Sequence, residues 1–352
     1  DKLYVEDLNG VQWDYYRTTY EKFLPYINNG FDFSEMLSEL LGELNVSHTG
    51  STYWGNGYTL STACLGLFFD PAYEGDGLKV QEVLRRGPFD VRNTKVKAGD
   101  IIEAIDGEKI EAGKDYNAML DGKVGRPVRV MLKGGREVVV KPISSGEQSK
   151  LLYRRWVDRN KAMVDKWSNG QIAYVHVKAM DSESFRTVFS ELLSDSNRQK
   201  KAVIVDERHN GGGWLHDDLC TLLSGRQYQS FVPRGQFIGW DPWNKWVKPS
   251  CVLVCEDDYS NGHGFPYVYQ KLGIGPVIGA PVAGTMTAVW WETMLDGQTV
   301  FGIPQVGCLG MDGKYGENQT LIPDITVYNT PEQQLSGDDQ QLRRAVEEML
   351  KK

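Results

Sequence analysis

A serine at position 260 occupies a strand-to-helix corner that could hold a nucleophile. Residues 252–255 form an apolar run typical of a buried strand, and residues 265–272 can form a helix. A hydroxyl at this corner projects from a sharp turn, and the free N–H groups that begin the helix can stabilise a developing oxyanion. Ser260-Asn261-Gly262 is also a common loop sequence, and the motif by itself favours an ordinary loop.

A histidine that could serve as the base, His48, follows Ser47 just beyond a predicted helix. Asp32 and Glu35 have the spacing of a capping box, and leucines then recur at helical period as far as Leu44. Side chains just past a helix end can point into a cleft. An isolated histidine is nevertheless more often a capping or turn residue than a catalytic one.

Three consecutive glycines, Gly211, Gly212 and Gly213, separate a predicted strand at 201–206 from a predicted helix at 216–223. Without Cβ atoms this backbone can approach a ligand closely and adopt unusual φ and ψ angles, as an oxyanion donor requires. A phosphate-binding loop is the competing interpretation. The loop lacks the Gly-Lys-Ser/Thr ending of a P-loop, and the chain has no dinucleotide-binding glycine spacing.

The elements that must position these residues fall into a β-rich segment and an α/β segment. Short β runs broken by glycines extend from about residue 59 to 143, and strands alternate with helices from residue 150 onward. The alternation predicts helices packed on a sheet, with the site at the strand ends. Near the end of the α/β segment, Glu317 precedes a Pro-Asp turn. An isolated glutamate is usually a surface charge.

The β-rich segment resembles a PDZ domain. The resemblance rests on Leu65-Gly66-Leu67-Phe68 at the position that binds a carboxylate, and on the turn at 97–102. PDZ domains bind extended peptides by strand addition and hold the terminal carboxylate on backbone N–H groups, so the implied partner is a peptide. The alternative is a structural β module with a closed groove.

The composition is that of a globular protein. The 352 residues are 41% hydrophobic and 24% charged, which predicts two or three domains with real cores. The longest apolar runs are too short for a membrane span, and a net charge of −8 without a basic block argues against nucleic-acid binding. The five cysteines lack metal-ligand spacing and are expected to be buried free thiols.

In their order along the chain, these motifs resemble the C-terminal half of the tricorn protease family, which belongs with the tail-specific (carboxyl-terminal processing) peptidases. The resemblance covers nearly the whole chain and implies an α/β multidomain fold without a cofactor or a metal. The implied parts are an N-terminal helical segment at 1–55, a PDZ-like β domain at 56–145 and a crotonase-like α/β peptidase core at 146–352.

Carried over residue by residue, the resemblance implies a serine endopeptidase that cleaves peptides or unfolded polypeptides. Ser260 would attack the scissile carbonyl to form an acyl-enzyme, and His48 would act as the general base. Ser47 and Glu317 would complete a catalytic tetrad, with Glu317 orienting and polarising the group beside the histidine.

The resemblance also implies backbone contacts with the substrate. The N–H groups of Asn261 and of one glycine among 211–213, with Gly211 or Gly212 favoured, would form the oxyanion hole, each donor contributing roughly 3 kcal/mol to the transition state. In the PDZ-like domain the peptide would bind at Leu65, Gly66 and Leu67.

The chain departs from the family pattern in two places. Asn261 stands where the archaeal tricorn pattern has an aspartate. This replacement keeps the backbone N–H donor but removes the carboxylate. Tail-specific peptidases proper use a Ser-Lys dyad, but no lysine lies between Lys271 and Lys314, so the histidine-based variant fits better. Tryptophans at 240–246 and 290–291 could shape an apolar subsite, although a position in an ordinary core or at a domain interface is the favoured interpretation.

Two other functions remain open from the sequence. A catalytically inactive PDZ-type scaffold would bind peptides, and a crotonase-type acyl-CoA enzyme would also use a glycine-rich oxyanion loop. The family resemblance allows a homo-oligomer. The chain begins at Asp1 without an initiator methionine or signal peptide, which favours a piece of a longer protein and leaves the compartment, cytoplasmic or periplasmic, open.

Overall fold

The computed structural model describes residues 2–55 and 61–352, and it divides the chain into two compact units. One unit combines Asp1–Asn56 with Asn160–Lys352, and the other comprises Gly57–Arg159. The N-terminal segment therefore belongs to the same unit as most of the predicted peptidase core. Residues 56–60, where the PDZ-like domain is predicted to begin, lie outside the described residues.

The N-terminal segment is helical, as its periodicity predicts. It contains η1 (Leu8–Gly10), α1 (Trp13–Glu21), η2 (Leu24–Tyr26) and α2 (Gly30–Gly42). The predicted capping box at Asp32 was wrong, because α2 begins earlier and its cap is Asn29. The Asn29 side chain accepts a hydrogen bond from the Asp32 amide at 2.9 Å, which is the interaction that a helix N-cap makes.

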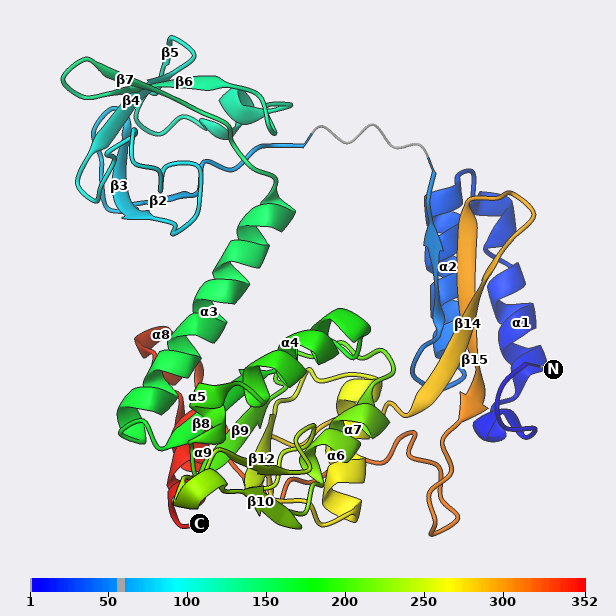
Figure 1. The fold of residues 1–352 in the computed structure, drawn as a ribbon. Helices are drawn as coiled ribbons and strands as arrows, with labels where there is room; N and C mark the ends of the chain where they lie inside the picture. Colours follow the sequence, from blue (N-terminus) through cyan, green and yellow to red (C-terminus); the bar gives the residue numbers. More distant parts are fainter. Residues whose placement is uncertain (1, 56–60) are drawn as a thin grey trace. The chain divides into compact units, whose positions relative to one another are not determined.

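A small antiparallel sheet follows the N-terminal helices in the same unit. Strand β1 (Gly50–Tyr53) pairs with β15 (Thr299–Gly307), which pairs with β14 (Thr287–Thr293). Helix α2 packs against β1 and β15, and Figure 1 shows α1 and α2 in blue beside the orange strands. Because Ser47 and His48 connect α2 to β1, this pairing brings them close to the start of β14.

The core of this unit is a parallel five-stranded sheet. In spatial order its strands are β16 (Ile325–Thr326), β13 (Val277–Gly279), β12 (Ser250–Val254), β9 (Ala202–Asp206) and β8 (Ile172–His176). Four of them, β8, β9, β12 and β13, are buried along their whole length, as expected for a sheet covered on both faces. Since β9 and β12 are adjacent and parallel, the loops that follow them meet at one edge of the sheet.

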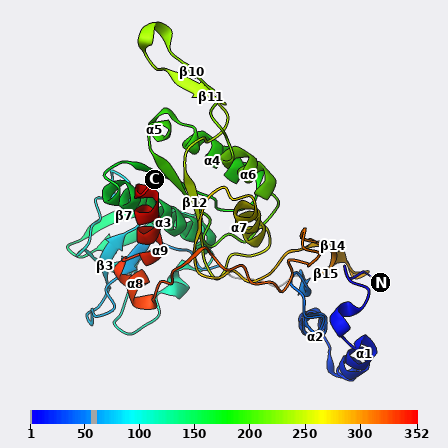
Figure 2. The same ribbon diagram turned by 90° about the horizontal axis from the view of Figure 1, so that it is seen from below.

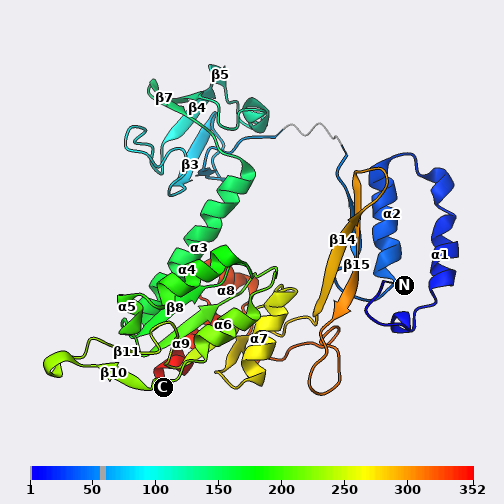
Figure 3. The ribbon, with the colours of Figure 1, turned by 45° about the vertical axis from the view of Figure 1, so that its right-hand side comes forward.

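Helices cover both faces of the parallel sheet. Helices α4 (Ser182–Leu192), α6 (His216–Leu223) and α7 (Asn261–Lys271) share an apolar core with Val203 and Val205 of β9. Figure 3 shows these three helices next to one another along the sheet. Helix α9 (Gln340–Leu350) packs against β8, β9, β12 and β13. It covers the opposite face of the sheet, to which Ile204 points because side chains alternate along a strand. The remaining helices are α3 (Ser145–Trp167), α5 (Asp195–Arg198) and α8 (Pro331–Ser336).

The predicted tryptophan cluster at 240–246 lies around a hairpin. Strands β10 (Gln229–Phe231) and β11 (Gly239–Asp241) form this hairpin, which projects from the core in Figure 2; η4 (Pro233–Gly235) lies in its connection. Trp240 and Trp246 are buried, so the core interpretation is correct for them. Trp243 is instead exposed, as are Trp290 and Trp291 on β14.

The second unit is a β domain with its own apolar core. Its strands are β2 (Leu67–Phe69), β3 (Leu78–Val83), β4 (Ile101–Ile105), β6 (Val128–Leu132) and β7 (Arg136–Val140), with β5 (Glu108–Lys109) paired to β4. This unit also contains the short helix η3 (Asn117–Leu120). Strand β2 is at the edge of the sheet, where an extended peptide could pair with it.

The architecture confirms the predicted α/β multidomain class. Helix α7 differs in length from its prediction, because it begins at Asn261 rather than at 265. All five cysteines are free, three of them buried, while Cys64 and Cys308 are partly exposed. In the ranges 2–55 and 61–352, no helix is long and apolar enough to cross a membrane.

Candidate active site

Ser260 connects β12 to α7 in a strained backbone conformation. Its φ and ψ are 57° and −120°, outside the regions that serine ordinarily adopts. The Ser260 amide donates a hydrogen bond to Thr285 Oγ1 at 2.8 Å, which holds this turn. The Ser260 hydroxyl makes no capping hydrogen bond to α7 and is therefore available for chemistry.

The triple-glycine loop packs directly on this turn. A Cβ atom at Gly212 would lie 2.5 Å from the Ser260 Cβ, so only glycine fits there, and its φ of +97° also favours glycine. A Cβ atom at Gly262 would lie 2.6 Å from the Asn210 carbonyl oxygen. The Tyr259 amide donates to the same oxygen at 2.9 Å. The two loops therefore interlock through their backbones.

Three backbone N–H groups beside the turn are free to bind an oxyanion. Within the ranges 2–55 and 61–352, the amides of Gly211, Gly213 and Asn261 have no hydrogen-bond acceptor. The Gly212 amide is in use, because it donates to Asn210 Oδ1 at 2.9 Å. A Cβ atom at Gly211 would have nothing within 4 Å, so this glycine is not required by a close contact.

A cavity of about 180 Å³ brings the candidate residues together. Gly213 and Asn261 contribute to its lining, whereas Gly211 and Gly212 do not. The other residues that line it are His48, Trp214, Ser260, Met286, Thr287, Ala288, Val289 and Cys308. His48 and Ser260, far apart in the sequence, therefore face one cavity.

The Ser47 hydroxyl links His48 to Glu317. Ser47 Oγ donates to Glu317 Oε2 at 2.9 Å, and the Ser47 amide donates to Glu317 Oε1 at 2.6 Å. The same hydroxyl lies 2.8 Å from His48 Nδ1. Glu317 is only 4% exposed, so it is not the surface charge that an isolated glutamate would be.

This network selects one tautomer of His48. A hydroxyl has a single proton, and Ser47 gives it to Glu317. The contact between Ser47 Oγ and His48 Nδ1 therefore requires the proton on Nδ1, with the imidazole as donor. Nε2 of the neutral ring then carries a lone pair and can accept a proton, as a general base must.

Three residues that the sequence analysis did not single out hold this arrangement. Thr287 Oγ1 lies 3.1 Å from both His48 Nδ1 and Ser47 Oγ. The Tyr259 hydroxyl accepts from the His48 amide at 2.8 Å, and the two rings are 4.8 Å apart. Thr285 accepts from the amide of the Ser260 turn. The sequence signal for these residues was weak: Tyr259 adjoins Ser260, and the two threonines lie in the region where tail-specific peptidases have their lysine.

Burial shifts the acid–base properties of both ends of the network. Burial lowers the pKa of His48, which favours the neutral ring. Burial raises the pKa of Glu317, while hydrogen bonds from Ser47 and Thr287 act in the opposite direction by stabilising its carboxylate.

The Asn261 side chain has a structural role that the sequence did not reveal. Its Oδ1 accepts hydrogen bonds from the amides of Leu215 at 2.8 Å and His216 at 3.1 Å, and its Nδ2 lies 2.9 Å from His216 Nδ1. The amide thus satisfies N–H groups at the start of α6. It joins α6 to the nucleophile turn, while the Asn261 backbone N–H stays free.

The β unit has a groove of about 390 Å³ along its edge strand. Leu65 and Leu67, predicted to bind peptide, line this groove with Phe69. The residues on its other walls include Thr62, Ala63, Cys64, Tyr116, Asn117, Leu120, Ser145 and Gln148. Gly66 adopts φ +66°, and a Cβ atom there would lie 2.8 Å from Pro88 Cδ.

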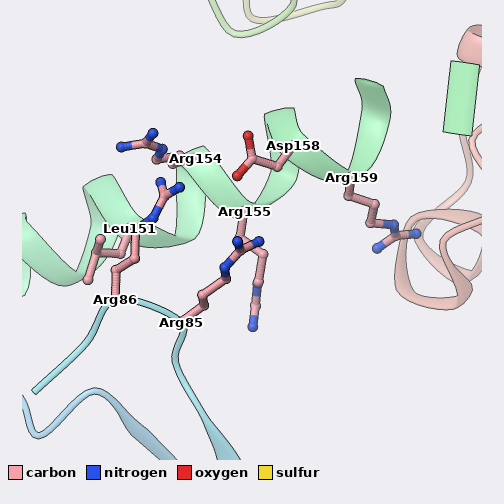
Figure 4. Close-up of a pocket in the computed structure, with 7 residues that line it drawn as sticks. All are labelled: Arg85, Arg86, Leu151, Arg154, Arg155, Asp158 and Arg159. Atoms are coloured by element: carbon pink, nitrogen blue, oxygen red, sulfur yellow. The ribbon is translucent and has the colours of Figure 1, made fainter. Parts of the chain in front are cut away.

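A second cavity of the β unit, of about 280 Å³, is strongly basic. Its lining residues, drawn in Figure 4, are Arg85, Arg86, Leu151, Arg154, Arg155, Asp158 and Arg159. Arg155 forms an ion pair with Glu82. No ion pair involves the other four arginines within the described parts of the chain. Planar guanidinium groups gathered in this way favour an anion.

Three family models match successive segments of the chain. The tricorn protease C1 domain matches residues 1–42, the tricorn protease PDZ domain matches residues 71–145, and peptidase family S41 matches residues 171–327. These matches confirm the predicted PDZ domain and the resemblance of the α/β core to tail-specific peptidases.

Similar proteins extend the likeness across the whole chain. Tricorn protease homolog 1 of Streptomyces coelicolor is 28% identical over 363 residues, covering 98% of this chain and 33% of that protein. The tricorn protease of Thermoplasma acidophilum is 26% identical over 356 residues, covering 94% of this chain and 32% of that protein. The chain thus spans about one third of the length of these relatives.

The fold is shared with a solved structure of the same kind. The crystal structure of the tricorn protease matches with a TM-score of 0.87 and 24% identity, covering 100% of this chain and 35% of that chain. The three family matches, the curated relatives and this fold agree with one another. Residues 171–327 match peptidase family S41 and two preceding segments match tricorn protease domains, so the chain resembles the tricorn proteases and is a serine-type peptidase.

Proposed function

We propose that this chain hydrolyses peptide bonds through an acyl-enzyme on Ser260, with His48 as general base. The observation that carries the proposal is the hydrogen-bonded series Glu317–Ser47–His48, which ends in the cavity that Ser260 also lines. A hydroxyl, a base and an orienting carboxylate are the parts that nucleophilic acyl transfer requires.

In the first step, Ser260 Oγ attacks the scissile carbonyl carbon while His48 Nε2 takes the hydroxyl proton. The imidazolium Nδ1–H donates to Ser47 Oγ, and the Glu317 carboxylate stabilises the positive charge through that hydroxyl. His48 then gives the proton to the leaving amine. Water enters, loses a proton to His48, and hydrolyses the ester to restore Ser260.

The amides of Asn261 and Gly213 are the proposed oxyanion donors. Both are without an acceptor in the described ranges, and both residues line the cavity. Each donor is worth roughly 3 kcal/mol to the transition state. The sequence favoured Gly211 or Gly212 instead. Gly213 is the better candidate because the Gly212 amide is bound to Asn210 Oδ1 and Gly211 does not line the cavity.

The proposed substrate is a peptide or an unfolded polypeptide. The β unit supports this class, because its edge strand β2 adjoins a groove with apolar side chains at Leu65, Leu67 and Phe69. Strand addition at such an edge binds extended chains through their backbones with little dependence on sequence. A folded protein would not offer a free strand to it.

The test is labelling with a serine-directed fluorophosphonate, followed by mass mapping of the modified peptide. Labelling at Ser260 that is lost in Ser260→Ala and strongly slowed in His48→Ala supports the proposal. Ser230→Ala, in the exposed strand β10, is the matched control and should label normally. If folded protein does not label but still binds peptides, the inactive peptide-binding scaffold becomes the better interpretation.

A further inference from the structure

Three side chains that can bind a metal meet outside the candidate active site. His209 lies in the loop after β9, and Cys255 and Asp257 lie in the loop after β12. Their ligand atoms all lie within 4.8 Å of one another. The imidazole and the carboxylate are partly exposed, so a metal ion can reach them from solvent, while the thiol is buried beneath them.

The separations of these atoms lie near those between the ligands of a tetrahedral ion, although each is outside that range as the side chains stand. His209 Nδ1 is 3.0 Å from both carboxylate oxygens of Asp257, and 3.7 Å from Cys255 Sγ. Cys255 Sγ is 2.8 Å from Asp257 Oδ1. Ligands around tetrahedral Zn²⁺ are separated by roughly 3.3 to 3.6 Å, given Zn–S of about 2.3 Å and Zn–N or Zn–O of about 2.0 Å. Small side-chain rotations would bring all three into range.

The backbone beneath the cluster is already fixed. The two oxygens of the buried Asp258 accept from the amides of Asn210 at 3.1 Å and Cys255 at 2.9 Å, which joins the two loops. The His209 amide also donates to Cys255 Sγ at 3.1 Å. A preorganised set of ligands loses little conformational entropy when it binds an ion.

We propose that His209, Cys255 and Asp257 form a Zn²⁺ site. One nitrogen, one sulfur and one oxygen ligand are a combination that zinc accepts and that magnesium or calcium does not favour. The thiol gives up its proton to solvent as the Zn–S bond forms, and a water molecule fills the fourth position. The loops that end in Gly213 and Ser260 become cross-linked.

The consequence of binding is a restraint beside the nucleophile. His209 begins the stretch that ends at Gly213, and Asp257 lies three residues before Ser260 along the chain. Zinc would stiffen both loops without touching the reacting atoms. The metal thus becomes a regulator of the site rather than a participant in its chemistry.

The experiment is a Co²⁺ and Zn²⁺ titration of the untagged, fully reduced protein. Co²⁺ should give a thiolate-to-metal absorption band and the intense visible bands of a tetrahedral site, and one equivalent of Zn²⁺ should remove them. Cys255→Ser should abolish the thiolate band. His209→Gln and Asp257→Asn, both at exposed positions, should each weaken Zn²⁺ affinity at least about 10- to 100-fold.

Cys64→Ser is the matched control, because Cys64 is a partly exposed thiol in the other unit and should leave the titration unchanged. Circular dichroism checks that each variant is folded. Absence of the thiolate band in wild-type protein, or its persistence in Cys255→Ser, would overturn the proposal and identify the cluster as hydrogen-bonded side chains only. These optical readouts do not depend on peptidase activity.

Discussion

The Ser47 hydroxyl donates its only proton to Glu317, at 2.9 Å, and can therefore only accept at His48. A buried carboxylate thus sets the tautomer of a histidine that it does not touch. This relationship resembles the aspartate–histidine contact of serine hydrolases, with a hydroxyl inserted between acid and base. It makes the role of Glu317 testable without knowledge of the natural substrate.

Glu317→Gln should lower the rate of Ser260 labelling by roughly 10²-fold, since the neutral amide no longer stabilises the imidazolium through Ser47. The side chain keeps its size, so the unfolding midpoint should change little. Glu332→Gln, at an exposed position in α8, is the control. A labelling rate equal to wild type would remove Glu317 from the proposed machinery.

The pH dependence of labelling should follow the neutral form of His48. Burial lowers the pKa of His48 from its ordinary value of 6.5, so the base stays unprotonated to a lower pH than usual. Burial raises the pKa of Glu317 above 4.5, so its carboxylate is lost earlier on acidification. Where protonation of His48 sets the acid limb, the midpoint should lie below the ordinary histidine value of 6.5. A midpoint above 6.5 would contradict this assignment.

Gly212→Ala should damage both stability and labelling. The new methyl would lie 2.5 Å from the Ser260 Cβ, and φ of +97° is unfavourable for alanine. A loss of about 1 to 3 kcal/mol in the free energy of unfolding is expected from urea denaturation. Gly211→Ala is the matched control, because that position has open space and should tolerate the methyl. Equal unfolding free energies and labelling rates of the two variants would argue against close packing of Gly212 on the Ser260 turn.

Asn261→Ala should destabilise the protein by about 1 kcal/mol, because the amides of Leu215 and His216 lose their acceptor at the start of α6. Asn261→Asp should retain most of that stability, since a carboxylate oxygen can accept the same two bonds. Both variants keep the backbone N–H proposed for the oxyanion hole. Thermal unfolding reports the loss of the side-chain hydrogen bonds at the start of α6. The labelling rate reports whether the backbone N–H still supports the reaction.

Much of the architecture follows from local sequence patterns. The predicted helix at 216–223 is observed with the same bounds, and β9 agrees within one residue with the strand predicted at 201–206, because buried parallel strands are short continuous apolar runs. The nucleophile corner was equally local, although its helix begins at Asn261 rather than at 265. The first turn of that helix was not predicted because it contains Gly262 and Gly264, and glycine is a poor helix former.

The pairing of distant residues was decided by tertiary structure alone. Glu317 is an unremarkable polar position in the sequence, and only the packing of its loop near Ser47 buries it and gives it a partner. Thr287 joins the network because β14 pairs with β15, which also pairs with β1. Local patterns encode periodicity and turns. They cannot encode which hydroxyl meets which carboxylate, because that depends on long-range strand pairing and burial.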